Sequence, residues 1–345
     1  MDRSDKLRQY IGDDEAVLVT SYPNIFYYSG FTSEDACLII TKDSSLLLTD
    51  SRYTIQAKQQ SSSYEVCEIS KTESIIKSLK QQILCIEEDV VSVSQFSKLQ
   101  GYGKKVKPFS KTIKYPRRVK EKEEIRKIAQ AEELGDRAFS YVLDLIKPGK
   151  TEKEIAIELE FFMRRNGASK LSFDTICASG VRSAMPHGVA SDKIIEKGDF
   201  LTLDFGCVLD GYCSDMTRTV VVGEVTQRQK EIYQIVLDAQ KAVLDSLRAG
   251  ILGKDADKLA RDIIDKAGYK DNFGHGTGHS VGVEIHELPS LSPRSEDVLE
   301  AGNVVSVEPG IYIEGFGGVR IEDLVQIGTE NALNLTKSQK DLLII

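Results

Sequence analysis

Four carboxylates in the second half of the chain have the type and spacing needed for chemistry. Three of them follow runs of β-branched or aliphatic residues that predict strands. A charge in such a strand is expensive unless it is paired or bound to a metal. These carboxylates are Asp204, Asp215, Glu308 and Glu322.

All four histidines of the sequence lie in the same half, each in a glycine-rich or turn-like context. A lone histidine is usually a structural residue. Four of them beside strand carboxylates favour a functional site instead. They are His187, His275, His279 and His286.

Two predicted hairpins would bring the carboxylates together. Asp210-Gly211 is a strong hairpin signal and separates Asp204 from Asp215. A second turn around Gly315 separates the two glutamates symmetrically. Side chains directly opposite on antiparallel strands are about 5 Å apart. Four converging carboxylates would repel one another, and divalent ions would remove that repulsion.

The donor set indicates which ions would suit the site. Oxygen ligands with one imidazole suit Mn²⁺, Co²⁺, Fe²⁺ or Zn²⁺. Shared carboxylates can bridge two ions at roughly 3.5–4 Å, the spacing of two-metal hydrolases. The alternative is a salt-bridge cluster with Arg218 and Arg320, which would not require the histidines.

The elements that position these residues form an α+β pattern. A helical period begins at Val119 and stops at Pro148-Gly149, and a capping box at Thr151–Glu154 starts a second helix. With two later helices the order is helix, helix, hairpin, helix, helix, hairpin, an internal pseudo-repeat. The remaining predicted elements are helices from Thr226 and over Lys254–Ala267, and strands Phe200–Val208, Gly211–Val222, Asn303–Ile313 and Gly318–Gln326.

The first part of the chain predicts a smaller mixed domain without histidine. The length of the whole chain, 345 residues, favours two domains, 1–115 and 116–345, with a linker near Gly101–Pro116. The predicted strands of the first domain are Ala16–Thr20, Ala36–Ile40, Ser45–Leu48, Tyr64–Ile69 and Ile83–Glu87.

Composition excludes some partners. A formal net charge of −8 without a basic stripe argues against nucleic acid, and the lack of a long apolar run argues against a membrane helix. The polar start, Met1 to Asp5, has no apolar signal core. None of the six cysteines forms a Cys-x-x-Cys pair, which favours buried free thiols and a cytoplasmic location.

These motifs resemble one superfamily over essentially the whole chain. Residues 120–335 resemble the methionine aminopeptidase/aminopeptidase P/prolidase superfamily of the M24 metallopeptidases, which implies a pita-bread fold. Residues 1–115 resemble the α/β creatinase-type N-terminal domain of its proline-specific branch. The motifs are Pro186-His187-Gly188, Asp204-Phe205-Gly206, Gly274–His279 with His286, Val307–Gly310 and Val319–Asp323.

The resemblance implies a role for each ligand. Asp204 would chelate one ion, His279 and Glu308 the other, while Asp215 and Glu322 would bridge them. The cofactors would be two divalent ions, Mn²⁺ first, or Co²⁺, with Zn²⁺ or Fe²⁺ as alternatives. All five ligands are present, unlike in creatinase or the pseudo-enzyme histone chaperones of this fold.

The resemblance also implies the catalytic groups. A metal-bridging hydroxide would attack the peptide carbonyl, with Glu308 as proton acceptor. His187 and His286 would donate hydrogen bonds to the substrate and the tetrahedral intermediate. His275 would lie at the edge of the proline pocket. Arg320 would pair with a bridging carboxylate or with a substrate carboxylate.

The expected function is hydrolysis of the Xaa-Pro bond at the N-terminus of short peptides, by a dipeptidase or an aminopeptidase. The compact length slightly favours the dipeptidase. By resemblance the protein would be a homodimer. The alternatives are a methionine aminopeptidase, for which the first domain is unnecessary, and a non-catalytic peptide-binding protein, which the intact ligand set disfavours.

Overall fold

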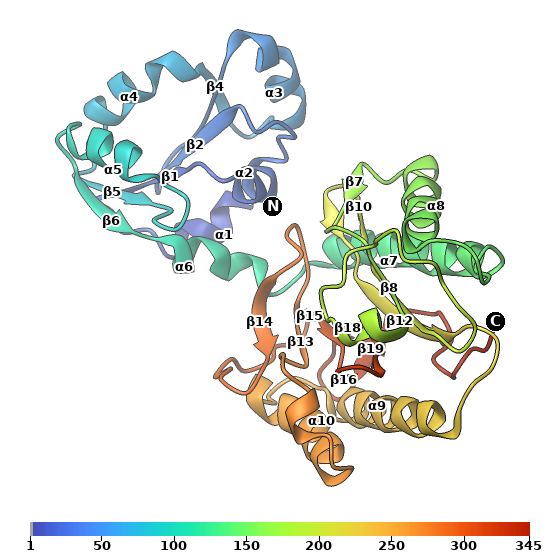
Figure 1. Cartoon of the computed structure of the whole chain (residues 1–345). Helices are drawn as coiled ribbons and strands as arrows, with labels where there is room; N and C mark the ends of the chain where they lie inside the picture. The colour runs from blue at the N-terminus through green and yellow to red at the C-terminus, as the bar shows by residue number, and fades with distance from the viewer. Residues whose placement is uncertain (1–2) are drawn as a thin grey trace. The chain divides into compact units, whose positions relative to one another are not determined.

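The computed structural model describes residues 3–345 and divides the chain into two compact units, each described here by itself (Figure 1). The first unit ends at Arg117 and the second begins at Arg118. Met1 and Asp2, the start of the polar N-terminus, lie outside the described residues. Within residues 3–345, no helix is both long enough and apolar enough to cross a membrane.

The first unit contains a six-stranded mixed sheet in the order β4-β3-β2-β1-β5-β6. The β1–β2 and β2–β3 pairs are antiparallel, and the other neighbours are parallel. The strands are β1 Glu15–Val19, β2 Ala36–Ile40, β3 Ser45–Thr49, β4 Glu65–Glu68, β5 Ile83–Ile86 and β6 Lys105–Pro108. The helices are α1 Ser4–Arg8, α2 Tyr22–Ser29, α3 Thr54–Gln60, α4 Thr72–Ser78, α5 Val93–Gln100 and α6 Ser110–Lys114.

The stretch expected to be a linker is structured. Strand β6 pairs in parallel with β5, and α6 follows directly. Strand β6 carries lysines at Lys105 and Lys107 and ends in Pro108, so its sequence resembles a loop. At the edge of a sheet a strand tolerates both proline and solvent-facing charges.

The helices of the second unit start as the sequence predicted. Thr151 Oγ1 accepts from the Glu154 N–H, and the Glu154 carboxylate accepts from the Thr151 N–H, which confirms the predicted capping box. Thr226 and Gln229 form another at the start of α9. The helices are α7 Lys122–Leu143, α8 Glu152–Arg165, α9 Gln227–Ser246 and α10 Gly253–Lys266.

Each predicted hairpin of the second unit is interrupted into two shorter ladders. The first ladder system consists of β9 with β12 and β10 with β11, and the second of β15 with β18 and β16 with β17. The first strands are β7 Lys170–Leu171, β8 Ile176–Ser179, β9 Phe200–Phe205, β10 Cys207–Leu209, β11 Tyr212–Cys213 and β12 Met216–Val221. The later strands are β13 Gly278–Ser280, β14 Glu287–Leu291, β15 Val304–Val307, β16 Gly310–Ile313, β17 Gly317–Arg320, β18 Asp323–Ile327 and β19 Ala332–Asn334.

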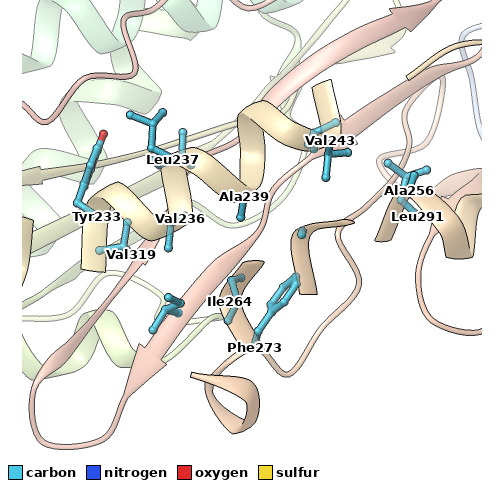
Figure 2. Packing of buried hydrophobic residues seen from close by; sticks show 14 of the residues in the cluster. Tyr233, Val236, Leu237, Ala239, Val243, Ala256, Ile264, Phe273, Leu291 and Val319 are labelled. Carbon is cyan, nitrogen blue, oxygen red and sulfur yellow. The ribbon is translucent and has the colours of Figure 1, made fainter. Parts of the chain in front are cut away.

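Two hydrophobic cores reflect the pseudo-repeat. In one core, α7 and α8 pack against β8, β9 and β12. In the other, α9 and α10 pack against the second strand system (Figure 2). Burial of these apolar side chains is the main favourable term in folding, and it fixes both strand systems against helices. Side chains of the second core include Tyr233, Val236, Leu237, Ala239, Val243, Ala256, Ile264, Phe273, Leu291 and Val319.

Candidate metal centre

The predicted carboxylate ligands lie at or beside the interruptions of the two hairpins. Val307 pairs with Asp323, and Gly310 pairs with Arg320. The same register places Glu308 opposite Glu322, although neither residue belongs to a strand. In the first hairpin Asp204 pairs with Thr217, so Asp204 and Asp215 are offset instead of directly opposite.

The backbone N–H groups at these interruptions bond to other elements. Asp215 N–H donates to Oε2 of Glu132 on α7 at 3.2 Å. Glu308 N–H donates to the Thr277 carbonyl at 2.8 Å, and Glu322 N–H to the Thr217 carbonyl at 3.1 Å. The backbone that carries three ligands is therefore fixed by partners outside its own hairpin ladder.

The ligand atoms meet in one place. One ligand atom each from Asp215, His279 and Glu322 lie within 4.8 Å of one another. Nε2 of His279 is 3.5 Å from Asp215 Oδ2 and 3.4 Å from Glu308 Oε1. Asp204 lines the same cavity, so the structure brings all five predicted ligands together.

The tautomer of His279 suits a metal ligand. Its Nδ1 lies 3.3 Å from the Ser280 carbonyl, which can only accept, so Nδ1 carries the proton. Nε2 then presents its lone pair towards the carboxylates. Burial lowers the His279 pKa to about 4, which keeps the ring neutral.

Two orphaned oxygens test whether this site fits divalent ions. Asp204 Oδ1 and Glu322 Oε1 are buried and have no hydrogen-bond partner among the described residues. Burial, followed by repulsion from neighbouring carboxylates, raises the pKa of Asp215 and of Glu322 well above the usual range. Burial also raises the Glu308 pKa, to about 8. Divalent cations would satisfy the orphaned oxygens and offset this repulsion, so the donor set fits two such ions.

Arg320 lies beside the ligands and uses all three of its nitrogens. Nη2 donates to Asp204 Oδ2 at 2.5 Å, Nε to Thr217 Oγ1 at 3.1 Å and Nη1 to Tyr312 Oη at 2.7 Å. The sequence predicted that Arg320 pairs with a bridging carboxylate or a substrate carboxylate, whereas the carboxylate that it contacts is Asp204, a predicted ligand of one ion and not a predicted bridge. Arg218 pairs with Asp323, not with a ligand carboxylate.

A hydrogen-bonded chain extends from Arg320 to His275. Tyr312 Oη is 2.8 Å from His275 Nε2, and His275 Nδ1 is 2.8 Å from the Gly276 carbonyl. That carbonyl fixes the proton on Nδ1, so Nε2 accepts from the Tyr312 hydroxyl. Burial lowers the His275 pKa to about 4 and raises the Tyr312 pKa to about 12.

The other two histidines line the same cavity. The His286 and His279 ring centroids are 4.4 Å apart. Burial lowers the pKa of His286 below the usual range of histidine. His187 lies on the segment that follows the 3₁₀ helix Gly180–Ala184.

The cavity has a volume of about 400 Å³ and is lined by polar and apolar side chains. The polar lining includes the five predicted ligands, the other histidines and Arg320. A cavity of this size suits a short peptide segment. The apolar lining consists of Phe173, Ile176, Pro186, Val189 and Ile285.

Sequence reasoning missed Glu132 and Tyr312. Glu132 is fully buried and accepts from the Asp215 N–H and, at 2.6 Å, from the Thr336 hydroxyl. It stands four residues after Ile128 on the apolar face of α7, and a carboxylate on that face is the signal that could have found it. Two residues that flank Asp215 bond to other carboxylates: the Thr217 hydroxyl donates to Glu322, and the Tyr212 hydroxyl donates to Glu124.

Comparison with known proteins agrees with this geometry. Residues 126–329 match the model of metallopeptidase family M24, and residues 3–119 match that of the creatinase/prolidase N-terminal domain. The chain belongs to metallopeptidase family M24. It is a metal-dependent hydrolase.

Relatives cover the whole chain. The chain is 40% identical to a Xaa-Pro dipeptidase of Pyrococcus furiosus, over 99% of both chains. The structure of a Xaa-Pro dipeptidase from Bacillus anthracis is 43% identical, with a TM-score of 0.97 over 100% of this chain and 99% of the other. That of an X-Pro aminopeptidase from Thermotoga maritima is 41% identical, with a TM-score of 0.93 over 100% of both. These likenesses confirm the predicted pita-bread fold with an α/β creatinase-like N-terminal domain.

Proposed function

We propose that this M24 peptidase hydrolyses the Xaa-Pro bond at the N-terminus of short peptides. The observation that carries the proposal is the convergence of Asp215, His279 and Glu322 in a cavity that apolar side chains also line. The Xaa-Pro specificity of the named relatives supports it.

Five side chains would hold two divalent ions, Mn²⁺ or Co²⁺ in our proposal. Asp204 would bind one ion, His279 and Glu308 the other, and Asp215 and Glu322 would bridge them. When bound, such ions supply a water activated at neutral pH and a Lewis acid for the carbonyl. The orphaned oxygens of Asp204 and Glu322 support this assignment.

The chain itself would move the proton and stabilise the oxyanion. Glu308 would accept the proton of the attacking water, and the Ser306 hydroxyl, which donates to Glu308 Oε1 at 3.2 Å, would orient it. His187 and His286 would donate hydrogen bonds to the developing oxyanion from the cavity wall.

The apolar lining of the cavity would receive the proline ring. The amide before proline is tertiary and has no N–H to donate, so its pocket needs apolar surface instead of an acceptor. Phe173, Ile176 and Ile285 offer that surface, and His275 would lie at its edge.

We also propose a cytoplasmic homodimer. All six cysteines are free and five of them are buried, as in a reducing compartment. The dimer rests on resemblance to proline-specific peptidases, and sedimentation analysis of the purified chain would test it.

A peptide panel would test the function. The protein, stripped with a chelator and reloaded with Mn²⁺, should cleave Ala-Pro-type peptides and cleave Xaa-Ala peptides poorly. Rapid cleavage of Met-Ala-Ser without cleavage before proline would instead identify a methionine aminopeptidase. Binding of proline peptides without hydrolysis, at two Mn²⁺ per chain, would identify a binding protein.

A further inference from the structure

We propose that the cavity selects peptides that continue beyond the proline and has no receptor for the free carboxylate of an Xaa-Pro dipeptide. This inference rests on the proposed Xaa-Pro function and reverses the slight preference for a dipeptidase that chain length suggested.

A dipeptide places its C-terminal carboxylate on the proline itself, so a dipeptidase site needs a cation there. Among the described residues that line the cavity, Arg320 is the only lysine or arginine. Its side chain is 3% exposed, and three of its five N–H groups already donate, to Asp204, Thr217 and Tyr312. Moving the guanidinium to a substrate would remove the partner of Asp204 Oδ2. We therefore assign Arg320 as a positioning residue for Asp204.

Two further arginines support the cavity walls from behind. Arg182 pairs with Glu152 at 3.0 Å and donates to the Val189 carbonyl at 2.7 Å. Arg261 pairs with Asp257 at 2.6 Å and donates to the His275 carbonyl. Their charges are matched by buried carboxylates, and their donors hold wall backbone instead of facing a ligand.

The charge balance of the cavity also disfavours an additional carboxylate. Five carboxylates line it, because Asp174 joins the four predicted ligands. Two divalent ions would bring four positive charges, and Arg320 supplies a fifth. The loaded site is then neutral overall, without the surplus positive charge that would stabilise a second anion in a partly buried cavity.

The rim of the cavity offers apolar surface where a longer peptide could continue. Val189 lines the cavity and is 52% exposed. Met185, directly before the lining residue Pro186, is 43% exposed. Surface of this kind would contact the residues after the proline and would gain nothing from a dipeptide.

Three substrates that differ only beyond the proline would test the inference. With Mn²⁺-loaded protein we expect kcat/KM for Ala-Pro-NH₂ and for Ala-Pro-Ala to exceed that for Ala-Pro by about tenfold or more. Amidation removes the carboxylate without adding a residue. A higher kcat/KM for Ala-Pro than for its amide would overturn the inference and leave the Xaa-Pro function standing. Failure to cleave any of the three would reject the function itself.

Arg320→Lys separates the two roles of the arginine. We expect calorimetric titration of the stripped variant with Mn²⁺ to show a weaker site, and kcat/KM to fall by the same factor for Ala-Pro and Ala-Pro-Ala. If the variant binds two Mn²⁺ with unchanged affinity and its KM rises only for Ala-Pro, Arg320 is the carboxylate receptor. If Arg320→Lys does not fold, Tyr312→Phe removes one partner of the guanidinium and is read in the same way.

A rim variant tests the positive part of the argument. Val189→Ser should lower kcat/KM several-fold for Ala-Pro-Leu and by a clearly smaller factor for Ala-Pro-NH₂, which has no residue beyond the proline. Ile157→Ser is the matched control, because Ile157 is exposed on α8 and is not among the residues that line the cavity. Equal effects of Val189→Ser on both substrates would remove the rim from the proposal.

Discussion

Lys120→Met should destabilise the second unit and slow catalysis without removing metal. The Lys120 side chain is 1% exposed, and Nζ donates to Glu287 Oε2 at 3.1 Å and to Ser280 Oγ at 2.8 Å. Ser280 directly follows His279, and Glu287 directly follows His286. The buried ion pair therefore joins the two segments that carry these histidines.

The expected loss follows from the burial of both partners. Removing one charge of a buried pair typically costs about 3–5 kcal/mol, because the other charge loses its ion-pair partner while it stays buried. Methionine keeps most of the lysine stem, so little of this cost is a cavity. For a unit the size of Arg118–Ile345, each kcal/mol corresponds to about 2–4 °C in Tm. The predicted decrease in Tm is therefore roughly 6–20 °C.

Thermal unfolding of the chelator-stripped protein measures this loss. Lys254→Met is the matched control, because Lys254 and Glu296 form an exposed pair that should contribute little to stability. The double variant Lys120→Met/Glu287→Leu should recover much of the Tm, since it removes both charges of the buried pair. If Lys120→Met lowers the Tm by no more than Lys254→Met does, the buried pair does not stabilise the unit as predicted.

Three further predictions concern the metal centre. Chelation should abolish peptidase activity and Mn²⁺ or Co²⁺ should restore it; full activity at a metal content shown to be zero by elemental analysis would contradict the ligand assignment. His187→Ala and His286→Ala should each lower kcat by about 10²–10³ with two Mn²⁺ still bound, as expected for loss of one oxyanion donor; an emptied metal site in either variant would make that histidine a ligand. The metal-free protein should lose stability as pH rises from 6.5 to 8, above the range in which the lowered pKa values of His275 and His279 act in the opposite direction. The folded-state pKa of Glu308, raised to about 8, lies above its unfolded value near 4.5, so its contribution is complete below pH 4.5 and is lost as pH rises through 8. The Tm difference between Mn²⁺-loaded and stripped protein should therefore widen over this range, and a constant difference would argue against the raised pKa.

Local signals were sufficient to predict most elements of the second unit. The capping box at Thr151 and the turn at Asp210-Gly211 depend on neighbouring residues only, and both are present. The interruptions of the strands could not be predicted in the same way. The run from Phe200 to Val208 is mostly apolar, and its ladder is interrupted at Gly206, opposite Asp215, whose N–H donates to Glu132 on α7. Strand β6 was missed because its alternation of lysines looks like a loop unless the neighbouring β5 is known.

The candidate site was predictable where residue type alone is informative. Histidines and strand carboxylates are costly in apolar surroundings, so the five proposed ligands stood out in the sequence. Tyr312 and Glu132 did not, because a tyrosine in a strand and a glutamate in a helix are ordinary. Their significance depends on burial and on distant partners. Tyr312 bonds to His275, more than thirty residues away in the sequence, and Glu132 bonds to Asp215, more than eighty residues away. Only the three-dimensional packing reveals these contacts.

The positions of the ligands explain why the hairpins are interrupted. A residue inside a continuous ladder has its backbone fixed by the neighbouring strand of the same hairpin. At the interruptions, Asp215 is held instead by α7, and Glu322 is held by Thr217 of the first hairpin through both backbone and side chain. Asp204 and Asp215 come from the first half of the pseudo-repeat, and His279, Glu308 and Glu322 from the second. Ions bound by both sets would link the two hydrophobic cores, so metal affinity and the stability of the whole unit should change together.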